Sequence, residues 1–150
     1  MGYVFVDIDG VLRRGFAASR IPGVLPALNQ ESVNALSLIA KADPALEFIL
    51  SSAWRLEYGY DRTVEYLESL GFPKGRFAGQ TPDLSGRSGI ASTDRRRAEY
   101  EAFLKAHDVK SYVILDDNRF LGALSLNQIM PTMNGLREAQ ARAALKLVKS

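Results

Sequence analysis

The stretch YVFVDIDGVL, residues 3–12, places two carboxylates directly after a run of β-branched and aromatic residues. The run from Tyr3 to Val6 is typical of a buried strand. Because side chains alternate between the two faces of a strand, Asp7 and Asp9 project to the same side and can share one ligand. Taken alone, the Asp-Gly step is also ordinary turn chemistry, so the rest of the chain decides between a site and a turn.

Apolar runs of strand length recur along the chain and alternate with helix-like segments. The strand-like runs cover residues 3–8, 46–50, 112–115 and, more weakly, 128–130. The first helical pattern runs from Asn29, a suitable N-cap, to Asp43, and the second covers residues 61–70. The third runs from Asp94, a second N-cap, to about His107, and the fourth covers residues 135–148. Strands joined by helices with short connections predict an α/β fold, a Rossmann-like three-layer sandwich with a mostly parallel sheet.

The bulk composition indicates one domain with a real core. A chain of 150 residues with 47% hydrophobic content suits a single domain over residues 1–150. The absence of cysteine excludes disulfides and thiolate metal sites. The apolar runs are much shorter than the roughly 20 residues of a membrane helix, and no charged-then-apolar leader precedes the first strand. We therefore expect a cytoplasmic protein with no membrane association, whose net charge of +2 tolerates phosphates without demanding nucleic acid.

Polar residues follow three of the four predicted strands. The first run ends in Asp7 and Asp9, the second in Ser51-Ser52 and the third in Asp116-Asp117. In open α/β sheets ligands bind outside the carboxyl ends of the strands, so we expect these side chains to converge. Four converging carboxylates would repel one another unless a hard, oxygen-liganded dication joined them. The sequence therefore predicts a Mg²⁺ site at this edge.

Together with three arginines at residues 95–97, these motifs resemble the haloacid dehalogenase (HAD) superfamily. That superfamily combines a D-x-D motif, a Ser or Thr after the second strand, a basic residue on a helix and a later acidic pair into a phosphoryl-transfer site. Within it, the chain resembles the small HAD domains of Swiss Army Knife RNA repair proteins. The segments that carry this closer resemblance are ILSSAWR at 49–55, TP at 81–82, ILDDN at 114–118 and GL at 135–136.

The resemblance implies a role for each residue at the strand ends. Asp7 would be the nucleophile that forms an aspartyl-phosphate, and Asp9 would protonate the leaving oxygen and then activate water. Ser51 would hydrogen-bond a phosphoryl oxygen, together with the backbone N–H of Ser52. The implied metal-binding residues are Asp7, Asp9 through its backbone carbonyl, Asp117, and Asp116 either directly or through water.

The basic element departs from the superfamily, which usually has a lysine there. Arg95 and Arg97 have acidic partners at i,i+4, Glu99 and Glu101, whereas Arg96 lies on the apolar stripe of the predicted helix. A cation near a helix N-terminus interacts unfavourably with the helix macrodipole, unless it binds an anion there. The spacing therefore favours Arg96 as the site residue, with Arg95 as the second choice.

Each motif taken alone has an ordinary alternative. Ser51-Ser52 can end a strand in a turn, and the acidic pair with Asn118 can form a turn of its own. The arginine run can be a solvated helix face. A calcium loop is excluded, because Leu12 and Arg13 stand where oxygen ligands would be required. Arg55 is open between a surface residue and a contact to substrate phosphate.

Two long irregular stretches, residues 13–28 and 72–93, are rich in Gly, Pro, Ser and Arg, and loops of this length are often functional. The intervals between the motifs leave little room for a folded cap. We therefore expect a HAD-like core with minimal or no cap, open to a large substrate such as a nucleic-acid end or a phosphoprotein. The arginines that could line the approach are Arg13, Arg14, Arg20, Arg55, Arg87 and Arg119, and Arg95 is a further candidate substrate contact.

Three functions remain open on the sequence. The leading hypothesis is a Mg²⁺-dependent phosphatase that acts on a phosphorylated RNA or DNA end or another large phosphorylated substrate, with partner proteins of a repair complex. The first alternative is a phosphatase of small metabolites or nucleotides. The second is a noncatalytic module that binds phosphate or docks a partner, because a fold does not guarantee activity. The intact Asp7 and Asp9 argue against this last reading.

Overall fold

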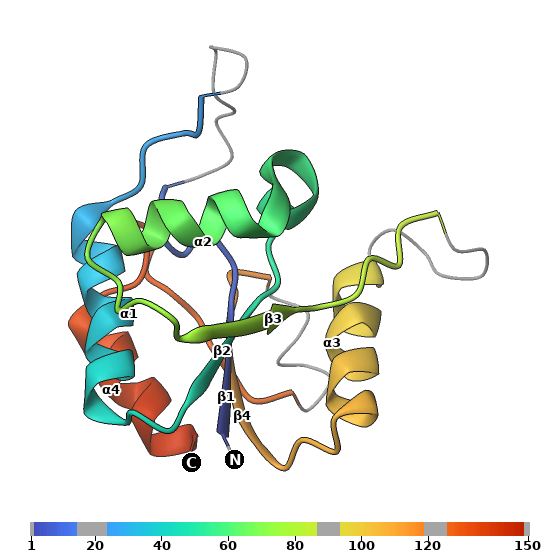
Figure 1. Ribbon diagram of the computed structural model, residues 1–150. Helices are drawn as coiled ribbons and strands as arrows, with labels where there is room; N and C mark the ends of the chain where they lie inside the picture. The colour runs from blue at the N-terminus through green and yellow to red at the C-terminus, as the bar shows by residue number, and fades with distance from the viewer. Residues whose placement is uncertain (1, 15–23, 87–93, 119–125, 149–150) are drawn as a thin grey trace.

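The computed structural model describes residues 2–14, 24–86, 94–118 and 126–148 (Figure 1). The described strands are β1 (Gly2–Val6), β2 (Glu47–Leu50), β3 (Phe77–Gln80), β4 (Ser111–Leu115) and β5 (Gln128–Ile129). The described helices are α1 (Gln30–Ala42), α2 (Tyr60–Ser69), α3 (Arg95–Ala106) and α4 (Glu138–Leu147), and a π-helical turn, η1 (Arg55–Gly59), leads into α2.

The strands form one parallel sheet in the order β3-β2-β1-β4-β5. The central strand β1 pairs with β2 on one side and β4 on the other, and its last residue, Val6, lies opposite Leu50 and Leu115. The chain passes from β1 outward through β2 to β3 and then crosses to the far side of β1 for β4 and β5. The strand order therefore reverses beside β1, and α/β sheets bind their ligands in the crevice at such a reversal.

Helices cover both faces of the sheet. Figure 1 shows α1 and α4 on one side of the sheet and α3 on the other. Since β1 alternates, Val4 and Val6 face the core that contains residues of α1, α2 and α4, and Phe5 faces the core that contains residues of α3. The buried residues of the second, smaller core are Phe5, Ile49, Tyr100, Phe103 and Ile114. The predicted α/β three-layer sandwich is confirmed, and the described part of its sheet is entirely parallel.

Two helices begin where the sequence signals place them. The side chain of Asn29 accepts a hydrogen bond from the backbone N–H of Glu31 at 2.9 Å, so Asn29 caps α1 as predicted, and α1 ends just before Asp43. The helix α3 begins directly after Asp94, but the Asp94 side chain makes no capping hydrogen bond. The boundary prediction was therefore correct for α3, whereas the predicted cap was wrong.

The segment before α4 packs on the loop that follows β1. Gly135 has a φ of 100° and exchanges two backbone hydrogen bonds with Thr132, so the chain turns here instead of starting the predicted helix. The N–H of the buried Leu136 then donates to the carbonyl of Val11 at 2.7 Å. The helix begins only at Glu138. The GL pair thus holds the loop after β1 in place.

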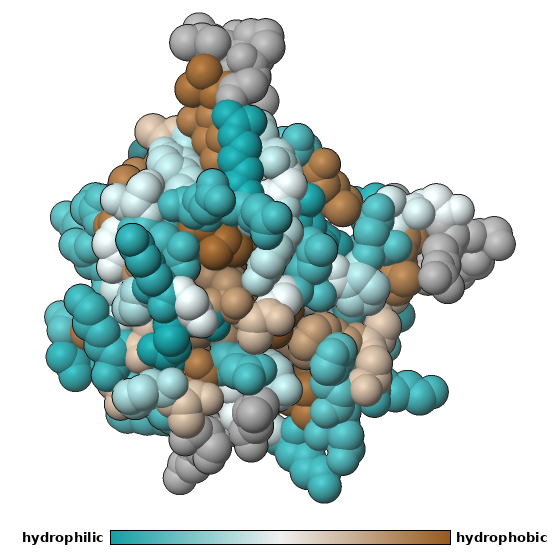
Figure 2. Space-filling model, in the orientation of Figure 1, coloured by the Kyte–Doolittle hydropathy of each residue, from teal (hydrophilic) through white to brown (hydrophobic). Residues whose placement is uncertain are grey.

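The edge strand β3 lies inside residues 72–93, for which the sequence predicts no regular structure. Its four residues, FAGQ, alternate between partly buried and exposed and include Gly79, so they form no apolar run. β3 borders β2 on one side only and forms one edge of the sheet. Figure 2 shows apolar residues near the centre of this face, where β3 lies in Figure 1, with hydrophilic residues around them.

The described helices and strands all belong to the sheet or to the layers that cover it. The expectation of a minimal or absent cap stays a prediction, because residues 15–23 and 87–93 lie outside the described part of the chain. Among the described residues, no helix is both long and apolar enough to cross a membrane.

We expect Gly135→Ala to destabilise the protein more than Gly75→Ala. Both glycines have a positive φ, 100° and 77°, so both substitutions impose backbone strain. A Cβ at Gly135 would lie 2.6 Å from Ser32 Oγ and 2.9 Å from the Val11 carbonyl oxygen, whereas a Cβ at Gly75 would meet nothing within 4 Å. Overpacking costs about 1–3 kcal/mol, which urea unfolding of the two variants would measure. Equal losses in the two variants would contradict this crowded contact.

Candidate active site

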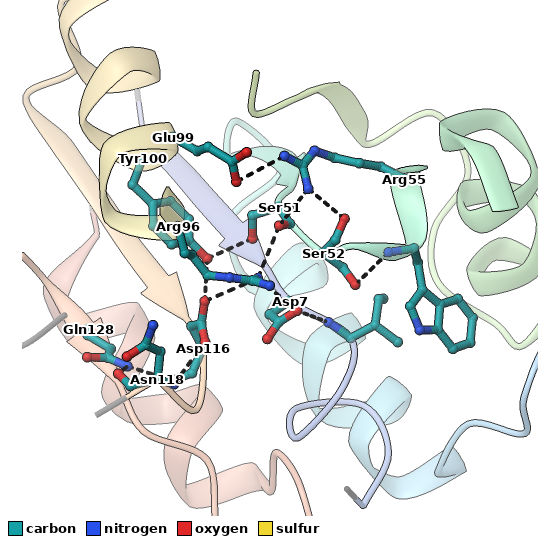
Figure 3. Close-up of polar contacts among 12 residues, drawn as sticks. Asp7, Ser51, Ser52, Arg55, Arg96, Glu99, Tyr100, Asp116, Asn118 and Gln128 are labelled. Carbon is teal, nitrogen blue, oxygen red and sulfur yellow. Dashed lines mark hydrogen bonds and ion pairs between the residues drawn. The ribbon is translucent and has the colours of Figure 1, made fainter. Parts of the chain in front are cut away.

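The carboxyl ends of β1, β2 and β4 bring Asp7, Ser51 and Asp116 together (Figure 3). The N–H of Asp7 donates to the carbonyl of Leu115 at 3.0 Å, and the N–H of Ser51 donates to the carbonyl of Val6 at 3.0 Å. These bonds continue the pairing of the sheet past the strand ends. Asp7 and Ser51 are therefore placed by the sheet itself, which gives the site a rigid base.

Asp7, Asp116 and Asp117 form a carboxylate cluster that could hold a metal ion. One oxygen from each side chain lies within 4.8 Å of the others. Asp7 and Asp116 are buried, with 4% and 1% of their surface exposed, and Asp117 is partly buried. Carboxylate oxygens are the ligands that Mg²⁺ prefers, so this donor set fits the predicted ion. The side chain of Asp9 lies outside the cluster among the described residues, and a contact through its backbone carbonyl stays a prediction.

The electrostatics of the cluster favour a bound cation. Burial raises the pKa of Asp7 well above its ordinary value, and the negative charges of Asp116 and Asp117 raise it further, against the lowering effect of Arg96. Burial also raises the pKa of Asp117, with the charge of Asp116 as the second cause. The ionised carboxylates are therefore poorly stabilised by the protein alone, and a dication would relieve their repulsion.

Of the three consecutive arginines, Arg96 reaches the cluster. Its Nη1 lies 3.2 Å from Asp7 Oδ1 and 3.5 Å from Asp116 Oδ2, and it donates to the carbonyl of Ser51 at 3.2 Å. Burial opposes the charge of Arg96, but Asp7, Tyr100 and Asp116 outweigh this effect and raise its pKa above the ordinary value. Arg96 thus places a fixed positive charge against Asp7, as the helical spacing predicts.

The two neighbouring arginines do not join the cluster. Arg97 approaches Glu101 at 3.8 Å, as the i,i+4 spacing predicts. Arg95 is exposed at the start of α3, and its predicted partner Glu99 pairs with Arg55 instead. The predicted pairing of Arg95 with Glu99 is therefore wrong, because Glu99 is buried and faces a different cation.

A tyrosine outside the sequence motifs, Tyr100, joins Ser51 to Asp116. Its hydroxyl lies 2.8 Å from Ser51 Oγ and 2.7 Å from Asp116 Oδ2. The ring is fully buried and meets Phe5 edge-on, with the centroids 5.4 Å apart. Burial raises the pKa of Tyr100 well above its ordinary value, and the charge of Asp116 raises it further, so the phenol keeps its proton.

Ser52 and Arg55 are occupied by contacts within the protein. The Oγ of Ser52 accepts a hydrogen bond from the N–H of Trp54 at 3.1 Å. The buried guanidinium of Arg55 donates to the carbonyls of Thr81, Ser51, Ser52 and Pro82 at 3.1, 3.2, 2.8 and 3.0 Å, and lies 3.1 Å from Glu99 Oε1. These five partners match the five N–H groups of an arginine, which leaves none for a substrate phosphate. Arg55 is therefore neither a surface residue nor placed to contact a substrate phosphate, and its role is structural.

The loop after β1 places Asp9 and Gly10 beside the cluster. Gly10 has a φ of 84°, and a Cβ there would lie 2.0 Å from Asp117 Oδ2, so only glycine allows Asp117 its position. Asp9 Oδ1 lies 3.5 Å from Arg13 Nη1. Burial raises the pKa of Asp9, while the charge of Arg13 and a hydrogen bond from Trp54 lower it in part. Asp9 therefore binds a proton more readily than an ordinary aspartate.

The arginines predicted along the approach are only partly described. Arg13 pairs with Asp9, and Arg14 is exposed. Three further candidates, Arg20, Arg87 and Arg119, lie outside the described residues. Substrate contacts from Arg13, Arg14 and Arg95 stay predictions.

The loop after β4 is held by Gln128 of β5. The side-chain amide of Gln128 donates to the carbonyls of Asp116 and Asn118 at 2.6 and 2.9 Å. The N–H of Asn118 donates to Asp116 Oδ1 at 2.9 Å, while Asp116 Oδ2 contacts Tyr100 and Arg96. Both oxygens of Asp116 thus have partners within the protein, which favours Asp117 over Asp116 as a direct metal ligand.

The sequence motifs missed three contributors to this site. Tyr100 lies four residues after Arg96 and so on the same helix face, a signal that was available. The sequence pattern offers Glu99 only as an i,i+4 partner of Arg95 on the same helix. Gln128 carries no local signal, because its contacts depend on how β5 pairs with β4.

We expect Arg55→Met to lower stability by about 3–5 kcal/mol, because it leaves the Glu99 carboxylate buried without its cation. Arg14→Met, at an exposed position, should change stability by no more than about 0.5 kcal/mol. Denaturant unfolding measures both, and adding Glu99→Gln to Arg55→Met should restore part of the loss. A variant that unfolds like the unmodified protein would show that the ion pair is not structural.

We expect Mg²⁺ to raise the melting temperature more at about pH 8 than at about pH 5. The raised pKa values of Asp7 and Asp117 favour the folded state below about pH 4, and this contribution is lost as the pH rises through the raised values. Mg²⁺ binds the ionised carboxylates, so it stabilises most where that loss is complete. At about 100 times its dissociation constant, the shift should be roughly 5–10 °C.

Thermal unfolding with and without Mg²⁺ checks this expectation. Asp117→Asn should remove most of the shift, and Asp108→Asn, at an exposed position just after α3, should keep it. A shift that is the same at both pH values, or that survives Asp117→Asn, would place the ion elsewhere.

Comparisons with known proteins agree with this geometry. Residues 3–141 match a family model described as the HAD domain in Swiss Army Knife RNA repair proteins. No curated protein matches the chain. The chain is similar in structure to D,D-heptose 1.7-bisphosphate phosphatase from B. bronchiseptica, crystallised with magnesium and phosphate, with a TM-score of 0.62, 15% sequence identity and coverage of 98% of each chain. That likeness shows a shared fold, and the family match over most of the sequence confirms the resemblance seen in its motifs. The chain therefore belongs to the family of HAD domains found in Swiss Army Knife RNA repair proteins.

Proposed function

We propose that this HAD domain is a Mg²⁺-dependent phosphatase that hydrolyses a phosphate monoester on a polynucleotide end through an aspartyl-phosphate. The observation that carries the proposal is the contact of Arg96 with Asp7 and Asp116 beside a carboxylate cluster, at the point where the strand order reverses. Membership of the HAD family and a fold shared with a phosphatase support the reaction class. The domain is thus an enzyme of the phosphoric monoester hydrolase class, and we expect it to act in the cytoplasm.

Asp7 is the nucleophile in this scheme. Its Oδ1 accepts a hydrogen bond from the N–H of Ile8 at 2.9 Å and lies 3.2 Å from Arg96, which leaves Oδ2 as the attacking oxygen. Oδ2 attacks phosphorus, the bond from phosphorus to the leaving oxygen breaks, and an aspartyl-phosphate forms. A water molecule then attacks phosphorus, which releases inorganic phosphate and restores the carboxylate.

Asp9 moves the protons. It gives a proton to the leaving oxygen in the first step and takes one from the attacking water in the second, which closes the proton balance. The raised pKa of Asp9, caused first by burial, suits a carboxyl group that must hold a proton before it donates it. General acid–base catalysis of this kind contributes about 10²–10⁴-fold.

Charge neutralisation supplies much of the remaining catalysis. In this scheme Ser51 and the backbone N–H of Ser52 bind phosphoryl oxygens, and Arg96, 3.2 Å from Asp7 Oδ1, holds Asp7 in place. A Mg²⁺ ion held by Asp7 and Asp117 would offset the negative charge of the phosphoryl group.

A large substrate is supported by the open architecture and by the family. The described residues include no cap over the carboxyl edge of the sheet, and Arg14 is exposed beside the loop that carries Asp9. The family is named for RNA repair proteins, so an RNA or DNA end and partner proteins in a repair complex are the natural expectation. Arginine suits this task, since it binds phosphate in a bidentate manner.

A small sugar or nucleotide phosphate is the second candidate. Its support is the structural likeness to a heptose bisphosphate phosphatase, which spans 98% of both chains. A core of this size therefore suffices for a small substrate in that protein. The two candidate functions differ only in which substrate binds at the carboxyl edge of the sheet.

We expect phosphate release that requires Mg²⁺, prefers phosphorylated oligonucleotides to mononucleotides and sugar phosphates, and falls by about 10³-fold or more in Asp7→Asn. The substitution keeps the shape of the side chain but removes the nucleophilic oxygen. Phosphate release from 5′- and 3′-phosphorylated RNA and DNA oligomers, mononucleotides and sugar phosphates measures both claims, with Asp108→Asn as the control.

Each result points to one function. Oligomer-selective release that depends on Asp7 supports end processing, and release from small substrates alone supports the second candidate. Undiminished release in Asp7→Asn would refute the aspartyl-phosphate. Mg²⁺ binding without any turnover would favour a noncatalytic phosphate-binding module.

A further inference from the structure

We propose that Tyr100 is a positioning residue of the phosphoryl site, whose hydroxyl fixes the side chain of Ser51 against Asp116. This inference rests on the proposed function, because Ser51 is the group expected to bind a phosphoryl oxygen. Tyr100 itself touches neither substrate nor metal in this scheme. It acts through the two residues with which its hydroxyl is in contact.

The hydroxyl of Tyr100 lies between two strand ends. Figure 3 shows the ring reaching from α3 toward the sheet, with dashed contacts to Ser51 after β2 and to Asp116 after β4. The distances, 2.8 and 2.7 Å, are those of good hydrogen bonds between oxygens. Ser51 and Asp116 come from strands that flank β1, so Tyr100 ties the two sides of the site across the strand that carries Asp7.

The number of protons on each group decides which group donates in these two hydrogen bonds. A phenol has one proton to donate, and an ionised carboxylate has none, so the proton of Tyr100 goes to Asp116 in a charge-assisted hydrogen bond. Before substrate binds, the oxygen of Tyr100 accepts the single proton of the Ser51 hydroxyl, and that proton turns to a phosphoryl oxygen when one arrives. In the substrate-free site the result is a chain in which Ser51 donates to Tyr100 and Tyr100 donates to Asp116.

This chain selects one orientation of a buried hydroxyl. A serine side chain has three staggered rotamers, and only one brings Oγ of Ser51 to the Tyr100 oxygen. The backbone carbonyl of Ser51 is held as well, by Arg96 and Arg55. Ser51 is therefore held at its carbonyl and its Oγ is held in position before a phosphoryl group arrives, so that only the O–H bond has to turn toward the phosphoryl oxygen.

Ring packing alone does not explain the tyrosine. Its ring meets Phe5 edge-on, and a phenylalanine would keep that contact. Tyr112 offers a matched comparison, because it also meets Phe5 edge-on, at 6.2 Å, while its hydroxyl accepts a hydrogen bond from the N–H of Asn127 at 3.3 Å, away from the acidic cluster. Comparing Tyr100→Phe with Tyr112→Phe therefore separates the effect of the Tyr100 hydroxyl on Ser51 from the effect of ring packing on Phe5.

The test is a double-mutant cycle on hydrolysis of p-nitrophenyl phosphate with Mg²⁺. We expect Ser51→Ala to lower kcat by about 10²-fold and Tyr100→Phe to lower it by about tenfold, because the first removes a donor and the second only misorients it. Tyr112→Phe should retain kcat. In the Ser51→Ala background, Tyr100→Phe should lower kcat by less than about twofold, since there is no hydroxyl left to orient.

Two outcomes would overturn the proposal. One is an unchanged kcat in Tyr100→Phe. The other is a full tenfold loss from Tyr100→Phe in the Ser51→Ala background, which would show that Tyr100 acts on something other than Ser51. Melting temperatures of all four variants confirm that the fold is retained, and a loss caused only by instability would appear equally in both backgrounds.

A binding measurement separates this proposal from the proposed function. Calorimetric titration with inorganic phosphate in the presence of Mg²⁺ should show weaker binding in Tyr100→Phe, and no further weakening when Ser51 is already alanine. If the unmodified protein binds phosphate but hydrolyses no monoester, the proposed function fails while this titration still decides the role of Tyr100. If the unmodified protein binds no phosphate, both proposals are overturned.

Discussion

The buried ion pair between Arg55 and Glu99 determines how α3 lies against the carboxyl ends of the strands. Two charges removed from water must find partners, and Arg55 satisfies that demand with four backbone carbonyls from the ends of β2 and β3 as well as with Glu99. Glu99 lies on α3 between Arg96 and Tyr100. Fixing Glu99 therefore fixes the rotation of α3, and with it the direction of both neighbours toward the sheet.

The site is thus assembled from two rigid parts with different chemistry. The sheet supplies the carboxylates and the serine hydroxyl, because backbone pairing continues past the ends of β1 and β2. The helix supplies the positive charge and the phenol. Such a division suits phosphoryl transfer, in which placement of charge contributes more than covalent chemistry by the protein.

Much of this arrangement could be predicted from the sequence, and the failures have a common cause. Asp7, Ser51 and Asp116 follow apolar runs, and parallel strands bring such ends to one edge, so a local pattern was sufficient. Arg96 was found from helical spacing for the same reason. The structural role of Arg55 and the strand β3 depend on contacts between distant segments, which leave no periodic trace in the chain. The pairing of Glu99 was mispredicted because a buried tertiary partner outweighed a neighbour on the helix surface.

The charge balance of the cluster also dictates an order of events. When ionised, Asp7, Asp116 and Asp117 place three negative charges close together, and among the described residues the guanidinium in contact with this cluster is that of Arg96. An anionic substrate that approaches such a surface meets a net repulsion until a dication reverses the balance. Metal should therefore enter before substrate, and an excess of phosphorylated compound without metal would find the site closed to it by charge alone.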